Sequence, residues 1–340
     1  MRMPAVLVAC ALALVAAAPA VAQEREKGEP RDAAAERRAQ ALVAAVVRVR
    51  MKALPNARSS ETLGDEREGT GVVIDDAGHV LTIGYLVIES AAIEVTTVDG
   101  STVPAELVAY DHATGFGLLR AQAPIGAQPI ALGESGALAL REPVMILPWG
   151  APAAASVAYV VSRREFTGSW EYLLDSAIFV SPPTLVWQGA ALVNREYELV
   201  GIGSLLVRDS VRAERPVPGN MFVPIDLLKP ILADLKASGR AAGPPRPWLG
   251  MATEEARGRL VVSRVSADSP AERAGVRAGD VVLGVGATPV KTHAELYRSV
   301  WALGPAGVEV PLKVLQDGDT KDLLVKSIDR ADFFRKKPVH

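Results

Sequence analysis

The strongest constraint on the fold of this chain is a succession of short segments with strand-like patterns, which begins at Val46. "VVRVRM" alternates from Val47, and "GTGVVID" and "HVLTIGYLV" flank the turn residues Asp-Ala-Gly at 76–78. "IEVTTV", "AELVAY", "FGLLRA" and "PVMILPW" follow, with turn residues between them. Short strands at this spacing are typical of sandwiches and barrels rather than of βαβ units. The sequence therefore predicts a mainly β first domain.

A second domain is indicated after a change in composition. "PIDLLKPILADLKASG" has the three-and-four spacing of a helix, which Gly239 is expected to end. Residues 239–247, "GRAAGPPRP", have the composition of a stiff, exposed linker. The segment beyond it contains strand-like runs and two capping boxes, "SPAE" from Ser269 and "THAE" from Thr292, each of which predicts the start of a helix. These signals predict a compact α+β unit.

The first residues have the features of a secretory signal peptide. Arg2 precedes the apolar run "AVLVACALALVAAAP", and the small residues 20–22 offer a cleavage site. We therefore expect export across the inner membrane to the periplasm, with lipoprotein anchoring through Cys10 as the less favoured alternative. The expected organisation is a signal peptide at 1–22, a charged Ala-rich lead-in at 23–43, the first domain at 44–238, the linker at 239–247, the second domain at 248–328 and a tail at 329–340.

Composition limits the partners and the means of stabilisation. Removal of the signal leaves 318 residues (340 − 22) without cysteine, because Cys10 is the only one, so the exported chain must rely on a packed core. No later segment has the 18 or so continuous apolar residues of a membrane span, so none is expected after signal removal. The net charge of −2 gives no reason to expect nucleic acid as a partner.

Both domains resemble one family, the high-temperature-requirement A (HtrA) proteases. "GTGVVIDDAGHVLT", "VPAELVAYDHATGFGLLR", "PIALGESGAL" and "MFVPIDLLKPIL" are similar to segments of their protease domain, and "SPAERAGVRAGDVVLGVGATPV" is similar to the signature of their PDZ domain. The resemblance covers roughly residues 44–328. It implies a trypsin-like double six-stranded β-barrel followed by an α+β PDZ domain.

The same resemblance puts unexpected residues at the catalytic positions. "LTIGYLV" aligns Tyr85 with the family's histidine, "ATGFGLL" aligns Gly115 with its aspartate, and "LVWQGAALVN" aligns Gln188 with its serine. The glycine of the oxyanion hole corresponds to Val186. A serine nucleophile needs a base of near-neutral pKa and a carboxylate that orients the base. Tyrosine titrates near pH 10, glycine has no side chain and an amide is no nucleophile, so the resemblance implies a degenerate triad.

A relocated triad is the alternative for catalysis. His79 or His112 would then act as base for Ser181 or Ser204, although none of these residues has the glycine context of a serine nucleophile. The sequence contains no HExxH motif and no Cys/His cluster, so no metal and no cofactor are expected.

The second domain is expected to keep a binding function. PDZ domains bind the C-terminus of a partner as an added strand, with its carboxylate held by backbone N–H groups of a short loop. Trp248-Leu249-Gly250-Met251 matches the form of that loop. The groove would lie between the strand that follows and the helix from His293, where Leu296 and Val300 offer an apolar wall.

We therefore expect an exported pseudoprotease that binds protein C-termini or unfolded segments, in quality control or in the regulation of an active protease. Two alternatives remain: an active serine endopeptidase with a non-standard arrangement, and a structural scaffold. The resemblance also implies a possible trimer, or a hetero-oligomer with an active relative.

Overall fold

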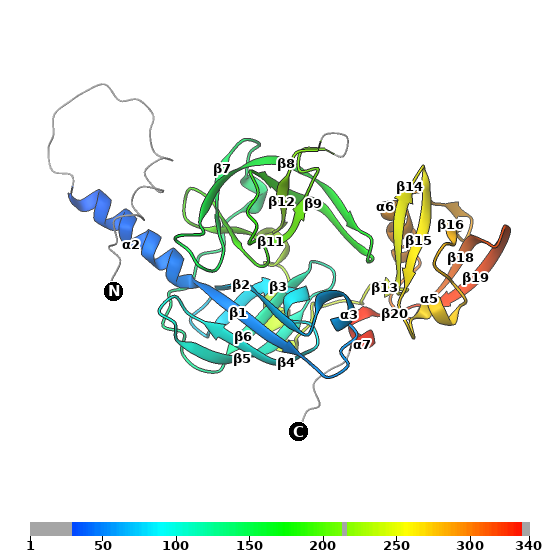
Figure 1. The fold of residues 1–340 in the computed structure, drawn as a ribbon, viewed down its shortest axis with the longest axis horizontal. Helices are drawn as coiled ribbons and strands as arrows, with labels where there is room; N and C mark the ends of the chain where they lie inside the picture. Colours follow the sequence, from blue (N-terminus) through cyan, green and yellow to red (C-terminus); the bar gives the residue numbers. More distant parts are fainter. Residues whose placement is uncertain (1–28, 213–215, 335–340) are drawn as a thin grey trace.

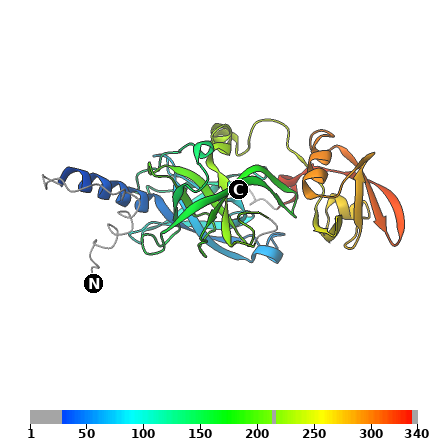
Figure 2. The same ribbon diagram turned by 90° about the horizontal axis from the view of Figure 1, so that it is seen from above.

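The computed structural model describes residues 29–212 and 216–334, which form two β-barrels and a smaller domain beside them (Figure 1). The predicted signal peptide with Cys10 lies outside the described residues, as does the end of the predicted tail. In the part that is described, no helix is long and apolar enough to cross a membrane. The molecule is elongated, with the smaller domain at one end and an N-terminal helix projecting from the other (Figure 2).

The first barrel closes in the order β1-β2-β3-β6-β5-β4. Its strands are β1 (Val46–Ala53), β2 (Glu66–Val73), β3 (His79–Ile83), β4 (Ser90–Thr96), β5 (Thr102–Tyr110) and β6 (Phe116–Ala121). The predicted alternation of β1 is confirmed, because Val47, Val49 and Met51 are buried in the barrel core while Arg48 pairs across the surface with Glu68 on β2 at 2.6 Å. Helix α2 (Glu29–Ala45) leads into this barrel, and α3 (Ser60–Leu63) and the 3₁₀ turn η1 (Gly84–Leu86) connect its strands.

The second barrel closes in the order β10-β11-β12-β9-β8-β7. Its strands are β7 (Pro143–Leu147), β8 (Ser156–Gly168), β9 (Tyr172–Ser181), β10 (Ala191–Val193), β11 (Leu199–Val207) and β12 (Gly219–Pro224), with the 3₁₀ turns η2 (Ser135–Ala137) and η3 (Ile225–Leu227). Strands β8 and β9 are long and form a hairpin that reaches beyond the barrel toward the smaller domain (Figure 1). The expectation of a mainly β, trypsin-like double barrel of six strands each is confirmed.

The helix predicted after β12 is shorter than expected. The chain forms η3 and then α4 (Leu232–Ser238), because Pro230 lacks a backbone donor and disfavours a helical conformation in the residue before it. The predicted end is confirmed: Gly239 is left-handed (φ 74°) and its N–H donates to Leu235 O.

The smaller domain has a sheet in the order β14-β15-β16-β18-β19. Its elements are β13 (Pro247–Trp248), β14 (Met251–Ala256), β15 (Arg259–Val265), α5 (Pro270–Arg273), β16 (Val281–Val285), β17 (Thr288–Pro289), α6 (His293–Trp301), β18 (Glu309–Gln316) and β19 (Asp319–Lys326). The capping box predicted at Thr292 is formed, because Thr292 Oγ1 accepts from Glu295 N and the Glu295 side chain accepts from Thr292 N. At Ser269 only half of the box is formed: Ser269 Oγ accepts from Glu272 N, but the Glu272 carboxylate accepts from Asp268 N instead of Ser269 N. The α+β expectation for this domain is confirmed.

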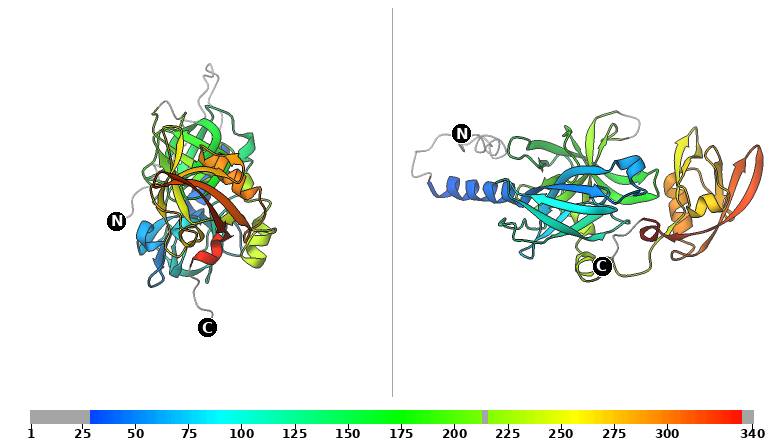
Figure 3. Two further views of the ribbon diagram at one scale, coloured as in Figure 1. Left: turned by 90° about the vertical axis from the view of Figure 1, so that its right-hand side faces the viewer. Right: turned by 60° about the horizontal axis from the view of Figure 1, so that its bottom comes forward.

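The segment expected to be a tail from residue 329 begins with ordered structure. Strand β20 (Ile328–Asp329) pairs with β13, and α7 (Arg330–Phe333) follows it. The pairing is supported by an aromatic contact, because the Trp248 and Phe333 rings lie 4.5 Å apart. Figure 3 shows α7 between the first barrel and the smaller domain, so these residues help to join the two.

Candidate functional site

The segments that carry Tyr85, Gly115 and Gln188 meet where the two barrels face each other. Tyr85 lies in η1 at the end of β3, and the preceding residue, Gly84, donates its N–H to Gly115 O at 2.8 Å. On the other side, Thr70 of β2 donates its N–H to Gln188 O at 2.8 Å. The structure therefore brings the three expected catalytic positions into one region, from three separate loops.

The Tyr85 side chain crosses from the first barrel to the second. Its hydroxyl donates to Ser204 O on β11 at 2.8 Å. Burial raises the pKa of the Tyr85 hydroxyl, and a hydrogen bond with the Trp187 side chain opposes this effect only in part. The phenol is therefore neutral at physiological pH and already donates its proton to a backbone carbonyl.

Gly115 has a left-handed conformation (φ 87°), and its surroundings leave little room for a side chain. A Cβ atom there would lie 3.0 Å from the Tyr172 hydroxyl, which itself donates to Thr114 O at 2.6 Å. The space beside Gly115 is thus occupied by a tyrosine of the second barrel.

The loop around Gln188 is fixed through its backbone. Gly189 has φ 74°, and a Cβ atom on it would lie 2.0 Å from Thr70 O, so only glycine fits. The N–H of Gly189 donates to Gly203 O at 2.9 Å. The Val186 amide, at the expected oxyanion position, donates to Thr184 Oγ1 at 3.3 Å, and the Val186 residue is 43% exposed.

The alternative histidine and serine residues have other partners. His79 Nδ1 lies 2.8 Å from Asp75 Oδ2, and Ser181 Oγ donates to Pro218 O at 2.9 Å. His112 packs with its ring centroid 4.1 Å from that of Tyr110, and burial lowers the pKa of His112 well below its usual value. No hydrogen bond joins either histidine to Ser181 or Ser204 among the residues that the structure describes. Over the same residues, no cluster of three or more acidic, histidine or cysteine side chains could hold a metal ion.

The loop expected to bind a carboxylate does hold one in this structure, and it comes from the second barrel. The backbone N–H groups of Leu249, Gly250 and Met251 donate to the carboxylate of Glu171 at 2.9, 2.7 and 3.2 Å. Glu171 lies in the turn between β8 and β9. Burial raises the pKa of Glu171 to about 7, although the three backbone N–H groups and Arg330 act in the opposite direction.

The apolar residues expected to line the groove are buried. Leu249, Met251, Leu296 and Val300 are each at most 3% exposed and belong to the core of the smaller domain. Leu173, from β9 of the second barrel, belongs to that same hydrophobic cluster. The hydrophobic core that contains the groove wall therefore includes an apolar side chain from outside its own domain.

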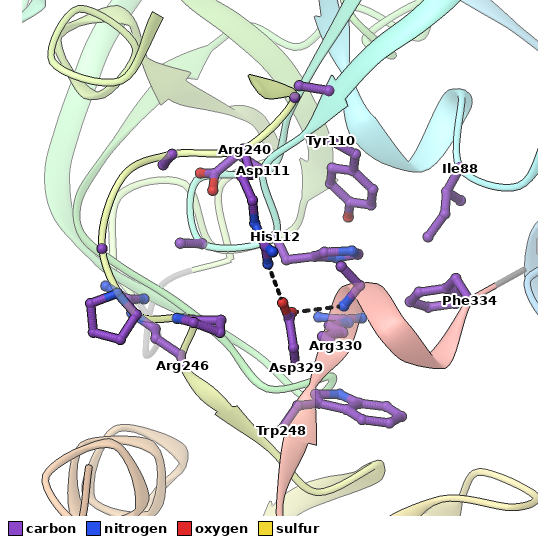
Figure 4. Close-up of a pocket in the computed structure, with 18 of the residues that line it drawn as sticks. Ile88, Tyr110, Asp111, His112, Arg240, Arg246, Trp248, Asp329, Arg330 and Phe334 are labelled. Carbon is purple, nitrogen blue, oxygen red and sulfur yellow. Dashed lines mark hydrogen bonds and ion pairs between the residues drawn. The ribbon is translucent and has the colours of Figure 1, made fainter. Parts of the chain in front are cut away.

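A cavity of about 620 Å³ lies beside this contact, between the first barrel, the linker and α7 (Figure 4). Tyr110, His112, Arg246, Trp248 and Arg330 are among the side chains that line it. Asp329 at its edge pairs with Arg240 of the linker. Glu171 also borders the cavity, so the cavity reaches the expected carboxylate loop.

The sequence did not indicate Glu171 or Tyr297 as site residues. Glu171 follows "GSW" in an ordinary turn, and nothing in that local pattern points to a loop far along the chain. Tyr297 lies on the expected groove helix α6, one residue after Leu296. Its hydroxyl donates to Gly168 O in the β8–β9 hairpin, and no sequence pattern predicts that this hairpin packs against α6.

Known proteins match the chain in two segments. Residues 69–202 match the family described as "Trypsin-like peptidase domain", and residues 247–326 match the "PDZ domain" family. The protein named "Probable periplasmic serine endoprotease DegP-like" of Ectopseudomonas mendocina (strain ymp) is 27% identical over 282 residues, which cover 77% of this chain and 57% of that protein. The protein of the same name from Hahella chejuensis (strain KCTC 2396) is 26% identical over 278 residues, 76% of this chain and 56% of the relative. The chain thus spans little more than half the length of these relatives.

Solved structures resemble the fold as well. "HtrA-type protease AlgW with decapeptide" has a TM-score of 0.52 at 19% identity, covering 88% of this chain and 99% of that one. "HtrA-type protease AlgW with tripeptide" has a TM-score of 0.51 at 19% identity, with 88% and 98% covered. At this level of identity the likeness concerns the fold.

Proposed function

This chain is a member of the HtrA family, with a trypsin-like peptidase domain and a PDZ domain, and from that premise we propose that it acts by binding rather than by cleavage. It would bind protein C-termini or unfolded segments through the PDZ groove, in periplasmic quality control or in the regulation of an active protease. The single observation that carries the proposal is the state of Tyr85, the residue at the expected base position. Its hydroxyl is buried and donates to Ser204 O.

The chemistry of the barrel supports the absence of cleavage. A general base must be deprotonated at the working pH and within reach of the nucleophile's proton. Tyr85 is neutral, Gly115 cannot orient a base, and Gln188 offers no nucleophile. Loss of triad members costs a factor of about 10⁴ to 10⁶ in rate. The hydrogen bond from Val186 N to Thr184 Oγ1 further supports a backbone that is not arranged as an oxyanion hole.

The PDZ loop supports the binding role. Three successive backbone N–H groups, on Leu249, Gly250 and Met251, converge on one carboxylate, which is the arrangement that captures a C-terminal carboxylate. The AlgW structures are complexes with a decapeptide and with a tripeptide, and we extend peptide binding to this chain as part of the proposal.

We further propose the domain boundaries 44–238 and 248–328, export to the periplasm, and assembly as a trimer or with an active relative. The periplasmic naming of the relatives supports the location. Two other functions are weighed against binding: a serine endopeptidase with a non-standard arrangement, and a scaffold with an unused groove.

A cleavage assay tests the proposal. Purified full-length protein is incubated with reduced, carboxymethylated lactalbumin as unfolded substrate, and separately with a fluorophosphonate probe for reactive serines. We expect neither fragments nor labelling. Reproducible cleavage that disappears on Ser181→Ala or Ser204→Ala would instead establish the endopeptidase. A scaffold predicts that no C-terminal peptide binds any form of the protein.

A further inference from the structure

The tip of the β8–β9 hairpin, residues 168–173, is held by the smaller domain at consecutive peptide units. Tyr297 Oη on α6 donates to Gly168 O at 2.6 Å and accepts from Glu171 N at 3.2 Å. Arg330 Nη1 donates to Trp170 O at 3.0 Å. Together with the Glu171 carboxylate in its loop, these bonds fix the whole tip against one surface, so the contact is specific rather than incidental.

The tip lies in the register of an added strand. Ser169 O accepts a hydrogen bond of 3.2 Å from Thr253 N on β14. Ser169 is two residues before Glu171, and Thr253 is two residues beyond the last donor of the carboxylate loop. Paired strands repeat their hydrogen bonding every second residue. A partner bound by strand addition, with its terminal carboxylate in the loop, would make this same bond from the residue two before its end.

The side chains complete the likeness to a bound peptide. The Glu171 carboxylate meets the three N–H groups that a terminal carboxylate would meet. Leu173 is 5% exposed and packs into the cluster that contains Leu296 and Val300, the expected wall for a ligand's apolar side chain. The hairpin thus supplies the PDZ groove with both an acidic group and an apolar side chain.

Ion pairs hold the sides of the hairpin near the tip. Arg298 of α6 binds Glu165 on β8 at 2.7 Å and Asp175 on β9 at 2.6 Å, and these side chains are largely exposed. Exposed pairs of this kind contribute little free energy, so the tip itself is the main attachment.

We infer that residues 168–173 are an internal ligand of the PDZ groove, and that a partner's C-terminus binds by displacing them. The inference rests on the proposed peptide binding and adds its regulation. It also defines the ligand class: a polypeptide with a free terminal carboxylate and an aliphatic side chain close to it, because the hairpin presents those two groups. An amidated C-terminus offers a single oxygen acceptor to the three N–H groups, so we expect it to compete poorly.

Displacement of the tip has a second consequence. The hairpin is continuous with β8 and β9, which are strands of the second barrel. A bound partner therefore releases the far end of two barrel strands from the PDZ domain, and binding loosens the attachment between the domains.

The first test measures peptide affinity in the full-length protein. A fluorescein-labelled decapeptide that ends in Ala-Leu with a free carboxylate is titrated by anisotropy, and its amidated form is the ligand control. Glu171→Ala empties the loop of its internal carboxyl group, whereas Glu196→Ala truncates an exposed glutamate in another turn. We expect at least about tenfold tighter binding for Glu171→Ala, no change for Glu196→Ala, and no binding of the amidated peptide.

The outcomes separate this inference from the proposed function. Equal affinity of the wild-type protein and Glu171→Ala overturns the internal ligand and leaves peptide binding intact. A complete lack of binding by every form, including Glu171→Ala, overturns the proposed function and with it the competition.

A second test detects the docked tip without any peptide. Amide hydrogen exchange of Leu249, Gly250 and Met251 is compared between the wild-type protein and Glu171→Ala, with the β16 amides as an internal check on folding. We expect at least about tenfold faster exchange at the loop in the variant and unchanged exchange in β16. Equal protection of the loop in both proteins overturns the inference.

Discussion

The attachment of Glu171 to the PDZ loop predicts a pH dependence whose sign follows from its pKa. Burial raises the pKa of docked Glu171 from its usual value of 4.5 to about 7. The docked state therefore holds its proton more tightly than the released state. Docking is most favourable below about pH 4.5 and weakens as the pH rises through 7.

The change in docking free energy with pH has an upper limit set by the pKa difference, and contact with solvent lowers it. The difference between a pKa of 4.5 and one of about 7 corresponds to at most about 3 kcal/mol. Glu171 retains some contact with solvent, which reduces the effect, so we expect a loss of about 1–2 kcal/mol between pH 5 and pH 8.

A matched variant separates the titration of Glu171 from the effects of other charged or ionisable groups near the tip. The arginines Arg330 and Arg298 lie beside the tip, and burial raises the pKa of Tyr297 so that it stays neutral in this range. His293 stacks on Tyr297 and lies 3.3 Å from Glu255. Glu171→Gln keeps all of these groups and removes only the titrating carboxyl.

The assay is the opening free energy of the loop amides of Leu249 and Gly250, obtained from hydrogen exchange at pH 5 and pH 8 after correction for intrinsic rates. The wild-type protein should lose about 1–2 kcal/mol of protection over this range, and Glu171→Gln should lose less. Stronger protection of the wild type at pH 8 would refute the reasoning, because it would mean that the three N–H donors outweigh burial and lower the pKa.

Three further predictions concern the barrels and the hairpin. Gln188→Ser alone should give no cleavage of unfolded lactalbumin and no fluorophosphonate labelling, because base and orienting acid remain absent; labelling at position 188 would contradict this. Gly189→Ala should lower the free energy of unfolding in urea by about 2–4 kcal/mol, since its Cβ would lie 2.0 Å from a carbonyl oxygen of the first barrel. Gly126→Ala, also at positive φ but with no atom within 4 Å, should cost only about 1 kcal/mol, and equal losses would argue against the clash. Tyr297→Phe removes the bond to Gly168 O and should speed exchange at the hairpin tip about five- to tenfold, whereas unchanged exchange would assign the residue to packing alone.

Local patterns in the sequence were sufficient for the elements that depend on local chemistry. The alternation in β1, the N-caps at Ser269 and Thr292 and the left-handed end at Gly239 all follow from interactions within a few residues. The helix after β12 is shorter than its apolar spacing predicts, because Pro230 interrupts the helical hydrogen bonding.

Contacts between distant segments could not be predicted in the same way. Glu171 and Leu249 are separated by 78 residues. The sequence around Glu171 has only the pattern of an ordinary hairpin turn. The loop itself could be recognised as a carboxylate site from Trp248 to Met251. What fills it depends on how the second barrel and the PDZ domain pack, which no local pattern encodes.

The most direct measurement is an NMR titration of the ¹⁵N-labelled full-length protein with the Ala-Leu decapeptide. We predict that the amide signals of Leu249, Gly250 and Met251 move to a second, peptide-bound position, that the Glu171 amide loses its protection in step with them, and that the peptide remains intact. Loop signals that stay fixed while the peptide binds elsewhere, or a peptide that is cut during the titration, would contradict the account.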